Sequence, residues 1–289
     1  MNLLKVGSKV GVVACSNGFP QRYESKIEIL CDKLIKLGLI PVLGSCIHMK
    51  DEAGSRTGKE RARELMSFYE QPDVTAIFDI SGGNLANEVI EFLDYESIKR
   101  NPKPLFGYSD LTCVLNAITA KTGVTTYLYQ IRNITYGCSE QQMDWLQKSL
   151  FKGEDELYQF PVTWIQGNRM EGVAVGGNIR CFLKLAGTPY FPKMKDKILV
   201  LEAYGGKPDL LTSFLTQLRG MGVFDEVAGI LLGTFTEMEA EGKHSCIGEI
   251  VKAVIDNPKL PIARTSWIGH GNDSKCIRIG ESIQLEERE

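Results

Sequence analysis

The sequence predicts an α/β protein in which a doubly wound, mostly parallel sheet domain precedes a smaller α/β domain with mixed strands. Two observations indicate this class. Short apolar, β-branched runs alternate with longer segments of helical periodicity, as in the run 9–15 followed by the stretch 21–37. The strand-like runs also end in turns of small polar residues, and open α/β sheets bind their ligands at such strand ends.

Four strand–helix units account for the first part of the chain. The expected strands are residues 9–15, 39–43, 74–80 and 104–108. The expected helices are residues 21–37, a charged stretch that ends near 69, a stretch that ends near 93, and 111–122, with a polar loop at 50–58. The pair Gly82-Gly83 and the residue Ser109 follow the third and fourth strands, so we expect them on the same rim of the sheet.

The alternation lapses between residues 129 and 172, where Gly137 and Gly153 flank one amphipathic helix. We therefore expect an N-terminal domain over 1–150, a linker over 151–168 and a C-terminal domain over 169–289. The expected elements of the second domain are strands at 172–175, 197–202 and 228–235, helices ending near 185, 219 and 255, and a hairpin-like tail at 275–285.

The composition is that of an ordinary globular protein with no electrostatic footprint for nucleic acid or an anionic membrane. The 289 residues are 43% hydrophobic and 24% charged, with a net charge of −3. The eight cysteines form no C-x-x-C pair, which favours reduced, structural thiols and a cytoplasmic location. No apolar run reaches the length of a membrane span.

The sequence contains no motif for a metal or a nucleotide cofactor. Its three histidines are scattered, and H-E-x-x-H, G-x-G-x-x-G and Walker patterns are all missing. We therefore expect chemistry that depends on side chains of the chain alone.

The stretch 104–112 combines a strand, a sharp turn and the start of a helix, with Ser109 at the corner. Nucleophilic serines are presented in this way on open α/β sheets, beside the positive end of the following helix. Ser109 and Asp110 are also of the residue types that cap helices, so this stretch alone fits either role. Only the first half of the G-x-S-x-G motif is present, because residue 111 is Leu.

A serine nucleophile needs a base, and histidine is the usual one. His48 and His244 stand in polar, charged surroundings typical of surface loops. His270 follows a strand and has a glycine on each side, which permits close approach of another chain segment. His270 is therefore the candidate base, with a turn histidine as the alternative.

The base in turn needs an orienting group. Glu202 follows directly after the apolar run 197–201, so its carboxylate is expected at the carboxyl end of a buried strand. Asp209 and Asp225 are rivals, but the first is expected at a helix N-terminus and the second in a loop. A merely solvated charge at the strand end is the alternative for Glu202.

Two backbone N–H groups are candidates for an oxyanion hole. Gly83 can offer an unhindered N–H, and Asp110, next to Ser109, can offer the second. An ordinary glycine turn is the alternative for Gly83.

In their order along the chain, these pieces resemble the LD-carboxypeptidase family of serine peptidases, which includes the microcin C immunity hydrolases. The resemblance covers nearly the whole chain. The matching segments are Gly82-Gly83, Leu93-Asp94-Tyr95, Asn101-Pro102-Lys103-Pro104, Gly107-Tyr108-Ser109-Asp110, Gly176-Gly177-Asn178, Gly187-Thr188-Pro189-Tyr190, Leu201-Glu202 and Gly269-His270-Gly271.

The resemblance implies a catalytic triad of Ser109, Glu202 and His270, divided between the two domains, with the active site in the cleft between them. It further implies a metal-independent, cytoplasmic and homodimeric enzyme. The substrate would be a small peptide, with L,D-carboxypeptidase removal of the terminal D-alanine from murein tetrapeptides as the first expectation. The alternative is an immunity-type hydrolase that splits peptidyl- or aminoacyl-nucleotide conjugates. A non-catalytic binding protein for such peptides is an alternative of another class.

Three departures from the family pattern concern the substrate. Residue 81 is Ser where carboxypeptidase members commonly have Arg, which removes a cation that could pair with a substrate carboxylate. Arg132 and Arg180 are candidate replacements, each with a solvated surface arginine as its alternative. The segment 127–130 lacks the Tyr-Gly-Pro that both branches usually carry. Immunity members also have a longer interdomain segment with an aromatic residue for the nucleotide base, a position for which Trp164 is a candidate.

Overall fold

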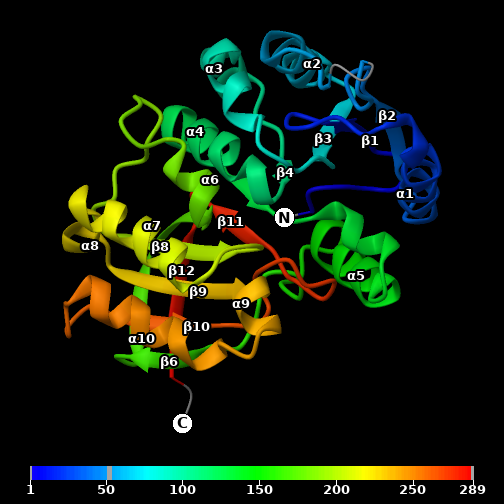
Figure 1. Cartoon of the computed structure of the whole chain (residues 1–289). Coiled ribbons are helices and arrows are strands. Elements are labelled where there is room, and N and C mark those ends of the chain that lie inside the picture. Colours follow the sequence, from blue (N-terminus) through cyan, green and yellow to red (C-terminus); the bar gives the residue numbers. More distant parts are fainter. Residues whose placement is uncertain (1, 51–53, 288–289) are drawn as a thin grey trace.

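The computed structural model describes residues 2–50 and 54–287, which form two six-stranded sheets covered by helices (Figure 1). The strands of the first sheet are β1 (Lys9–Val13), β2 (Ile40–Leu43), β3 (Val74–Asp79), β4 (Leu105–Gly107), β5 (Thr126–Leu128) and β11 (Ile277–Ile279). Their order is β11-β5-β4-β3-β1-β2, and every neighbouring pair is parallel except β11 with β5. The expected mostly parallel first sheet is confirmed.

Helices cover both faces of this sheet. They are α1 (Glu24–Lys36), α2 (Gly58–Glu70), α3 (Tyr95–Arg100), α4 (Thr112–Thr122) and α5 (Ser139–Leu146), with short 3-10 segments η1 (Gln21–Tyr23), η2 (Ala86–Phe92), η3 (Ser109–Leu111) and η4 (Ile131–Thr135) and a π segment η5 (Gln147–Phe151). Apolar side chains of α1 and α5 pack on one face, and those of α2, α3 and α4 pack on the other. The sheet is therefore doubly wound.

The second sheet is mixed. Its strands are β6 (Thr163–Gln166), β7 (Arg169–Asn178), β8 (Lys197–Ala203), β9 (Gly229–Phe235), β10 (Ile262–Arg264) and β12 (Ser282–Glu286). The order is β12-β7-β8-β9-β10-β6, with four parallel strands between antiparallel edges. The helices of this part are α6 (Ile179–Leu183), α7 (Pro208–Gly220), α8 (Val223–Glu226), α9 (Thr236–Ala240) and α10 (His244–Ile255). The apolar faces of α7 and α10 cover the sheet on one side. The expected mixed α/β architecture of the second part is confirmed.

Helix α4 lies between the two sheets and joins their cores. One hydrophobic cluster includes Leu115 and Ile118 of α4 together with Ala174 and Val200 of the second sheet. Most of α4 is buried, including the polar residues Thr112 and Asn116. The side chain of Asn116 donates to the carbonyl of Gly176 and accepts from its N–H, both at 2.8 Å, so the helix is fixed against the end of β7.

The order β2-β1-β3-β4-β5 reverses between β1 and β3, and this is the position where open α/β sheets form a ligand crevice. The chain leaves β1 through Asn17 and leaves β3 through Gly82, and an isolated bridge joins these two residues. The expected placement of the glycine pair at a strand end therefore coincides with the topological switch point.

Three sequence expectations differ from the structure. The helix expected before residue 93 is the 3-10 segment η2. The strand β6 lies inside the expected linker, where it pairs with β10. The tail is not a hairpin, because β11 pairs with β5 whereas β12 pairs with β7. Hydrogen bonds between Ala174 of β7 and the turn at Gly280 and Glu281 hold the turn against β7, so the two strands diverge into different sheets. The domain limits themselves stay a prediction.

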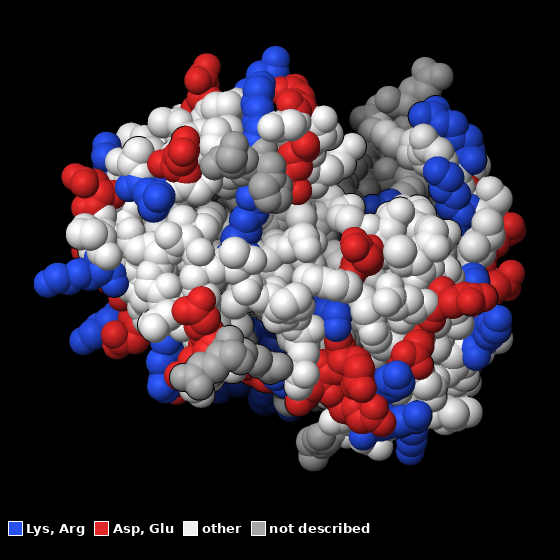
Figure 2. All heavy atoms as spheres, turned by 90° about the horizontal axis from the view of Figure 1, so that it is seen from below, with Lys and Arg blue, Asp and Glu red and all other residues white. Residues whose placement is uncertain are grey.

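Of the expected loop 50–58, residues 51–53 lie outside the described residues. Within residues 2–50 and 54–287, every helix falls short of the length and apolar character that a bilayer crossing demands. On the face seen in Figure 2, acidic and basic side chains are interspersed, apart from a group of acidic ones near the lower edge.

Phe106 in β4 tests how strongly the strand before Ser109 depends on its core. The side chain has no exposed surface, and its ring lies 4.9 Å from that of Phe78 and 4.5 Å from that of Tyr127. We expect Phe106→Ala to lower the free energy of unfolding by about 3–5 kcal/mol, because it loses buried area and leaves a cavity. Urea denaturation measures this, with Phe106→Leu as the milder control. Equal effects of the two variants would contradict the assignment of Phe106 to a tightly packed core.

Candidate active site

Ser109 occupies a strained turn between β4 and α4. Its φ is +54°, and the only other non-glycine residues with positive φ in the described part of the chain are Asp196 and Asp256. Such a backbone angle is uncommon for a residue with a Cβ, and it concentrates at functional sites. The turn matches the strand-to-helix elbow that presents a nucleophile at the edge of an α/β sheet.

Ser109 and His270 line one cavity of about 540 Å³ between the two halves of the molecule. The first half also contributes Gly83, and the second contributes Asn178 and Arg180. The structure thus brings together residues that are far apart in the sequence. Among residues 2–50 and 54–287 no hydrogen bond joins Ser109 to His270. The two residues are related by lining the same cavity. Catalytic hydrogen bonds in ligand-free enzymes are often long and tighten when substrate binds.

His270 is held by Glu202 at the end of β8. The distance from His270 Nδ1 to Glu202 Oε2 is 2.8 Å, and the carboxylate has no exposed surface. A carboxylate on Nδ1 leaves Nε2 as the free nitrogen of the ring. The rings of Tyr108 and Tyr204 lie 4.9 Å and 5.1 Å from the imidazole, which fixes its plane. Burial, and then the charge of Glu202, raise the pKa of Tyr108, so its hydroxyl stays protonated.

The glycine before this histidine is needed for the loop to reach the cavity. Gly269 has a φ of +156°, and a Cβ there would overlap the side chain of Thr234 on β9. Only glycine tolerates this close approach.

Gly83 lies in the loop after β3 and Asp110 in the turn after β4, and their role as oxyanion donors stays a prediction. Gly83 has a φ of +131°, and a Cβ on it would overlap the side chain of Asn17. Asn17 accepts a hydrogen bond from the N–H of Asn84 at 2.8 Å and so fixes the glycine loop. Within the described ranges, no hydrogen bond occupies the N–H of Gly83 or that of Asp110. Gly83 lines the cavity, whereas Asp110 directly follows Ser109 and has no exposed surface.

The side chain of Asp110 is buried and makes hydrogen bonds to several other segments, a role that the sequence did not reveal. One oxygen accepts from Ser16 Oγ at 2.7 Å and from the N–H of Ala86 at 2.9 Å. The other lies 2.5 Å from Lys184 Nζ and 3.3 Å from Cys181 Sγ. Burial alone would raise the pKa of Asp110, but the hydrogen bonds from Lys184, Ser16 and Ala86 outweigh burial and hold its pKa below the usual range. The carboxylate is therefore charged and compensated from both halves of the molecule.

Arg180 was a candidate carboxylate anchor, and the structure places it at the cavity. It reaches from α6 to the first half, where it donates to Asn84 Oδ1 at 2.7 Å and to the carbonyl of Gly83 at 2.9 Å. Arg132 instead donates to Gln130 and lies over the ring of Phe19, away from this cavity.

The remaining candidates lie elsewhere. His48 pairs with Glu24 at 2.9 Å, and His244 is the first residue of α10. Asp209 lies in the first turn of α7, as expected, whereas Asp225 lies in the short helix α8 rather than in a loop. In the described chain no group of three acidic, cysteine or histidine side chains has the arrangement of a metal site.

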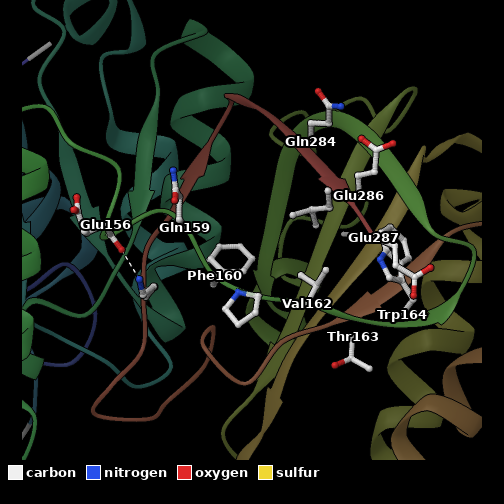
Figure 3. A pocket seen from close by; sticks show the side chains of 12 residues that line it. Glu156, Gln159, Phe160, Val162, Thr163, Trp164, Gln284, Glu286 and Glu287 are labelled. Carbon is white, nitrogen blue, oxygen red and sulfur yellow. Dashed lines mark hydrogen bonds between the residues drawn. The ribbon is translucent and has the colours of Figure 1, made fainter. Parts of the chain in front are cut away.

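Trp164 lines a different cavity from Ser109. This second cavity, of about 1030 Å³, lies between the segment before β6 and the strand β12 (Figure 3). Phe160 and Val162 contribute its apolar wall, and Glu286 projects from β12 on the opposite side. Trp164 therefore does not border the cavity that Ser109 and His270 line.

Two α/β domains with a shared cavity at the carboxyl ends of their strands define the class of this protein. Residues 10–129 match the LD-carboxypeptidase N-terminal domain, and residues 171–285 match the LD-carboxypeptidase C-terminal domain. The chain belongs to the LD-carboxypeptidase family of peptidases, and the resemblance seen in its motifs is confirmed.

Curated relatives match over most of their length. A putative carboxypeptidase of Treponema pallidum is 30% identical, over 98% of this chain and 91% of the relative. The microcin C7 self-immunity protein MccF of Escherichia coli is 25% identical, over 98% and 92%. The murein tetrapeptide carboxypeptidase of Pseudomonas aeruginosa is 27% identical, over 80% and 78%. The relatives thus include one named for microcin self-immunity and one named as a murein tetrapeptide carboxypeptidase.

Solved structures share the fold. An MccF-like protein from Bacillus anthracis superposes with a TM-score of 0.87 at 24% identity, covering 99% of this chain and 95% of that one. MccF in complex with glutamyl sulfamoyl guanosine gives 0.85 at 23% identity, covering 99% and 97%. At these identities the likeness establishes the architecture and leaves the substrate to other arguments.

The charge on Asp110 predicts a dependence of stability on pH. Its folded pKa lies below the unfolded value of about 3.9. The stability that this carboxylate provides is therefore fully present above about pH 4 and is lost as the pH falls through the folded pKa. Urea unfolding between pH 7 and pH 2 should show a flatter acid limb for Asp110→Asn than for the parent. Parallel acid limbs would contradict a charged Asp110 in the folded state.

Proposed function

We propose that the chain is a serine-type peptidase in which Ser109 is the nucleophile, His270 the general base and Glu202 the group that orients the base. The observation that carries the proposal is the strained turn at Ser109, in one cavity with a His270 that is paired to a buried Glu202. Helix capping by Ser109, a turn histidine at His270 and a solvated charge at Glu202 would each explain one residue separately. They do not account for all three converging from two domains.

In the proposed reaction, His270 carries out each proton transfer. Ser109 Oγ attacks the carbonyl carbon of the scissile amide, and His270 Nε2 takes the hydroxyl proton. The Nδ1–H donates to Glu202, which stabilises the imidazolium that forms. The N–H groups of Gly83 and Asp110 hold the oxyanion. The intermediate then collapses, His270 protonates the leaving amine, and water hydrolyses the acyl-enzyme by the same steps.

The substrate that we propose is a small peptide with a free terminal carboxylate, with murein tetrapeptides that end in D-alanine as the first candidate. Arg180 supports this choice, because a guanidinium binds a carboxylate through two parallel hydrogen bonds. Its side chain is 43% exposed, it lines the cavity, and the nearest acid, Asp110, already has Lys184 at 2.5 Å. Arg180 thus supplies the cation that Ser81 does not.

Peptidyl- or aminoacyl-nucleotide conjugates are the second candidate substrate. MccF matches 98% of this chain, and its solved complexes contain glutamyl sulfamoyl guanosine and aspartyl sulfamoyl adenosine. The segment 80–84, in which Ser81 precedes the glycine pair, also resembles the immunity branch of the family more than the carboxypeptidases. A cytoplasmic location and a homodimer belong to the same proposal, and the free state of all eight cysteines fits a reducing compartment.

Ser109→Ala tests the nucleophile directly. We expect turnover to fall by roughly 10⁴-fold or more while substrate binding is retained, because the lost hydroxyl acts only in the chemical step. The assay incubates the parent and the variant with a murein tetrapeptide and with an aminoacyl sulfamoyl adenosine, and mass spectrometry identifies products. Release of D-alanine supports the first candidate, and release of the sulfamoyl nucleoside supports the second. Near-parental turnover by the variant removes Ser109 from the mechanism, and binding without product by the parent favours a binding protein.

Arg180→Gln tests the carboxylate anchor. We expect kcat/KM for the tetrapeptide to fall by about 10–100-fold, since a hydrogen bond to a charged group contributes about 1.5–3 kcal/mol. The matched control is the same peptide with a terminal amide, for which parent and variant should differ by less than about threefold. Equal losses on the acid and the amide would assign Arg180 to structure.

A further inference from the structure

Lys184 crosses from the second domain to the first directly behind the proposed oxyanion hole. It is the residue that follows α6, and its side chain is 15% exposed. Its ammonium group donates to the carbonyl of Asn84 at 2.8 Å and to Asp110 Oδ1 at 2.5 Å. One cation therefore contacts two segments that are separate in the sequence.

These two segments carry the two proposed oxyanion donors. Asn84 directly follows Gly83, whose N–H is one donor, and Asp110 carries the other on its own backbone. Asn17 already fixes the glycine loop from the side of β1. Lys184 ties this loop to the turn after Ser109, together with the hydrogen bond from the Ala86 N–H to Asp110.

Lys184 does not belong to the cavity wall. The residues that line the cavity include Arg180, one helical turn earlier, but not Lys184. Arg180 NH2 lies 3.8 Å from Asp110, farther than Lys184, and its other hydrogen bonds go to Gly83 and Asn84. A substrate in the cavity meets Arg180, whereas Lys184 can act on the reaction only through the groups that it holds, the Asn84 carbonyl and the Asp110 carboxylate.

We propose that Lys184 is a positioning residue that sets the separation of the Gly83 and Asp110 N–H groups for the transition state. This inference rests on the proposed function. An oxyanion hole acts through donors that are fixed before the reaction, aimed at the place where the charge develops. Loss of such an alignment weakens transition-state binding and leaves ground-state binding unchanged, so kcat falls while KM does not.

The structural alternative is that Lys184 merely neutralises a buried carboxylate. Lys184→Met alone leaves Asp110 buried without its closest cation, which destabilises the fold whatever else Lys184 does. The test therefore introduces Lys184→Met into the Asp110→Asn background, where no carboxylate needs a counterion, and measures kcat, KM and Tm of all four proteins. Lys195→Met, at an exposed position of the same domain, is the matched control.

In the Asp110→Asn background we expect Lys184→Met to lower kcat by about tenfold or more, with KM and the control changed by less than threefold. Binding of uncleaved substrate should also be equal in the double variant Ser109→Ala, Asp110→Asn and in the same variant with Lys184→Met added. A kcat that changes by less than threefold in that background overturns the inference, as does a rise of KM that accounts for the loss. Retained turnover in Ser109→Ala overturns the proposed function and this inference with it, so the two failures are distinguishable.

Discussion

The buried carboxylate of Asp110 is the constraint on which the rest of the arrangement depends. A charge without exposed surface must be compensated by hydrogen bonds and a cation, or the folded state becomes costly. The first domain supplies Ser16 and Ala86, and the second supplies Lys184. Neither domain alone satisfies the carboxylate, so its compensation fixes how the two domains meet. Because Ser109 precedes it directly, the same contacts fix the strained turn that faces the cavity.

Helix α4 adds a packed interface to the contacts of Asp110 and so also fixes how the two domains meet. Its first turn follows Ser109, and its side chains join the cores of both sheets. The paired hydrogen bonds between Asn116 and Gly176 then place the end of β7 beside the turn, and with it Asn178 and Arg180. The cavity therefore lies beside this fixed junction, and its lining residues come from both domains. This arrangement suits a site in which a nucleophile from one domain works with a base from the other.

The fold class and the triad candidates could be predicted because their signals are local. Strand–helix alternation, a serine at a strand end and a histidine between glycines are all visible within a few residues of sequence. The ion pair of Asp110 could not be predicted from the sequence, because its partner Lys184 is 74 residues away. A lysine near a helix end is ordinarily expected to be exposed to solvent. Strands β5 and β6 have three and four residues, too few for a periodic signal. The turn at Gly280 resembled a hairpin, and only pairing with distant strands separates its two arms.

That separation has a consequence for how the protein is made. The edge of the first sheet beside β5 is covered by β11, which follows β5 only after the whole second sheet up to β10. During synthesis the first sheet emerges first, and its β5 edge stays open until β11 has also emerged. An unpaired edge can recruit a foreign strand, so the nascent chain is exposed to aggregation during that interval. Loss of β11 would therefore harm the sheet from which it is farthest in sequence.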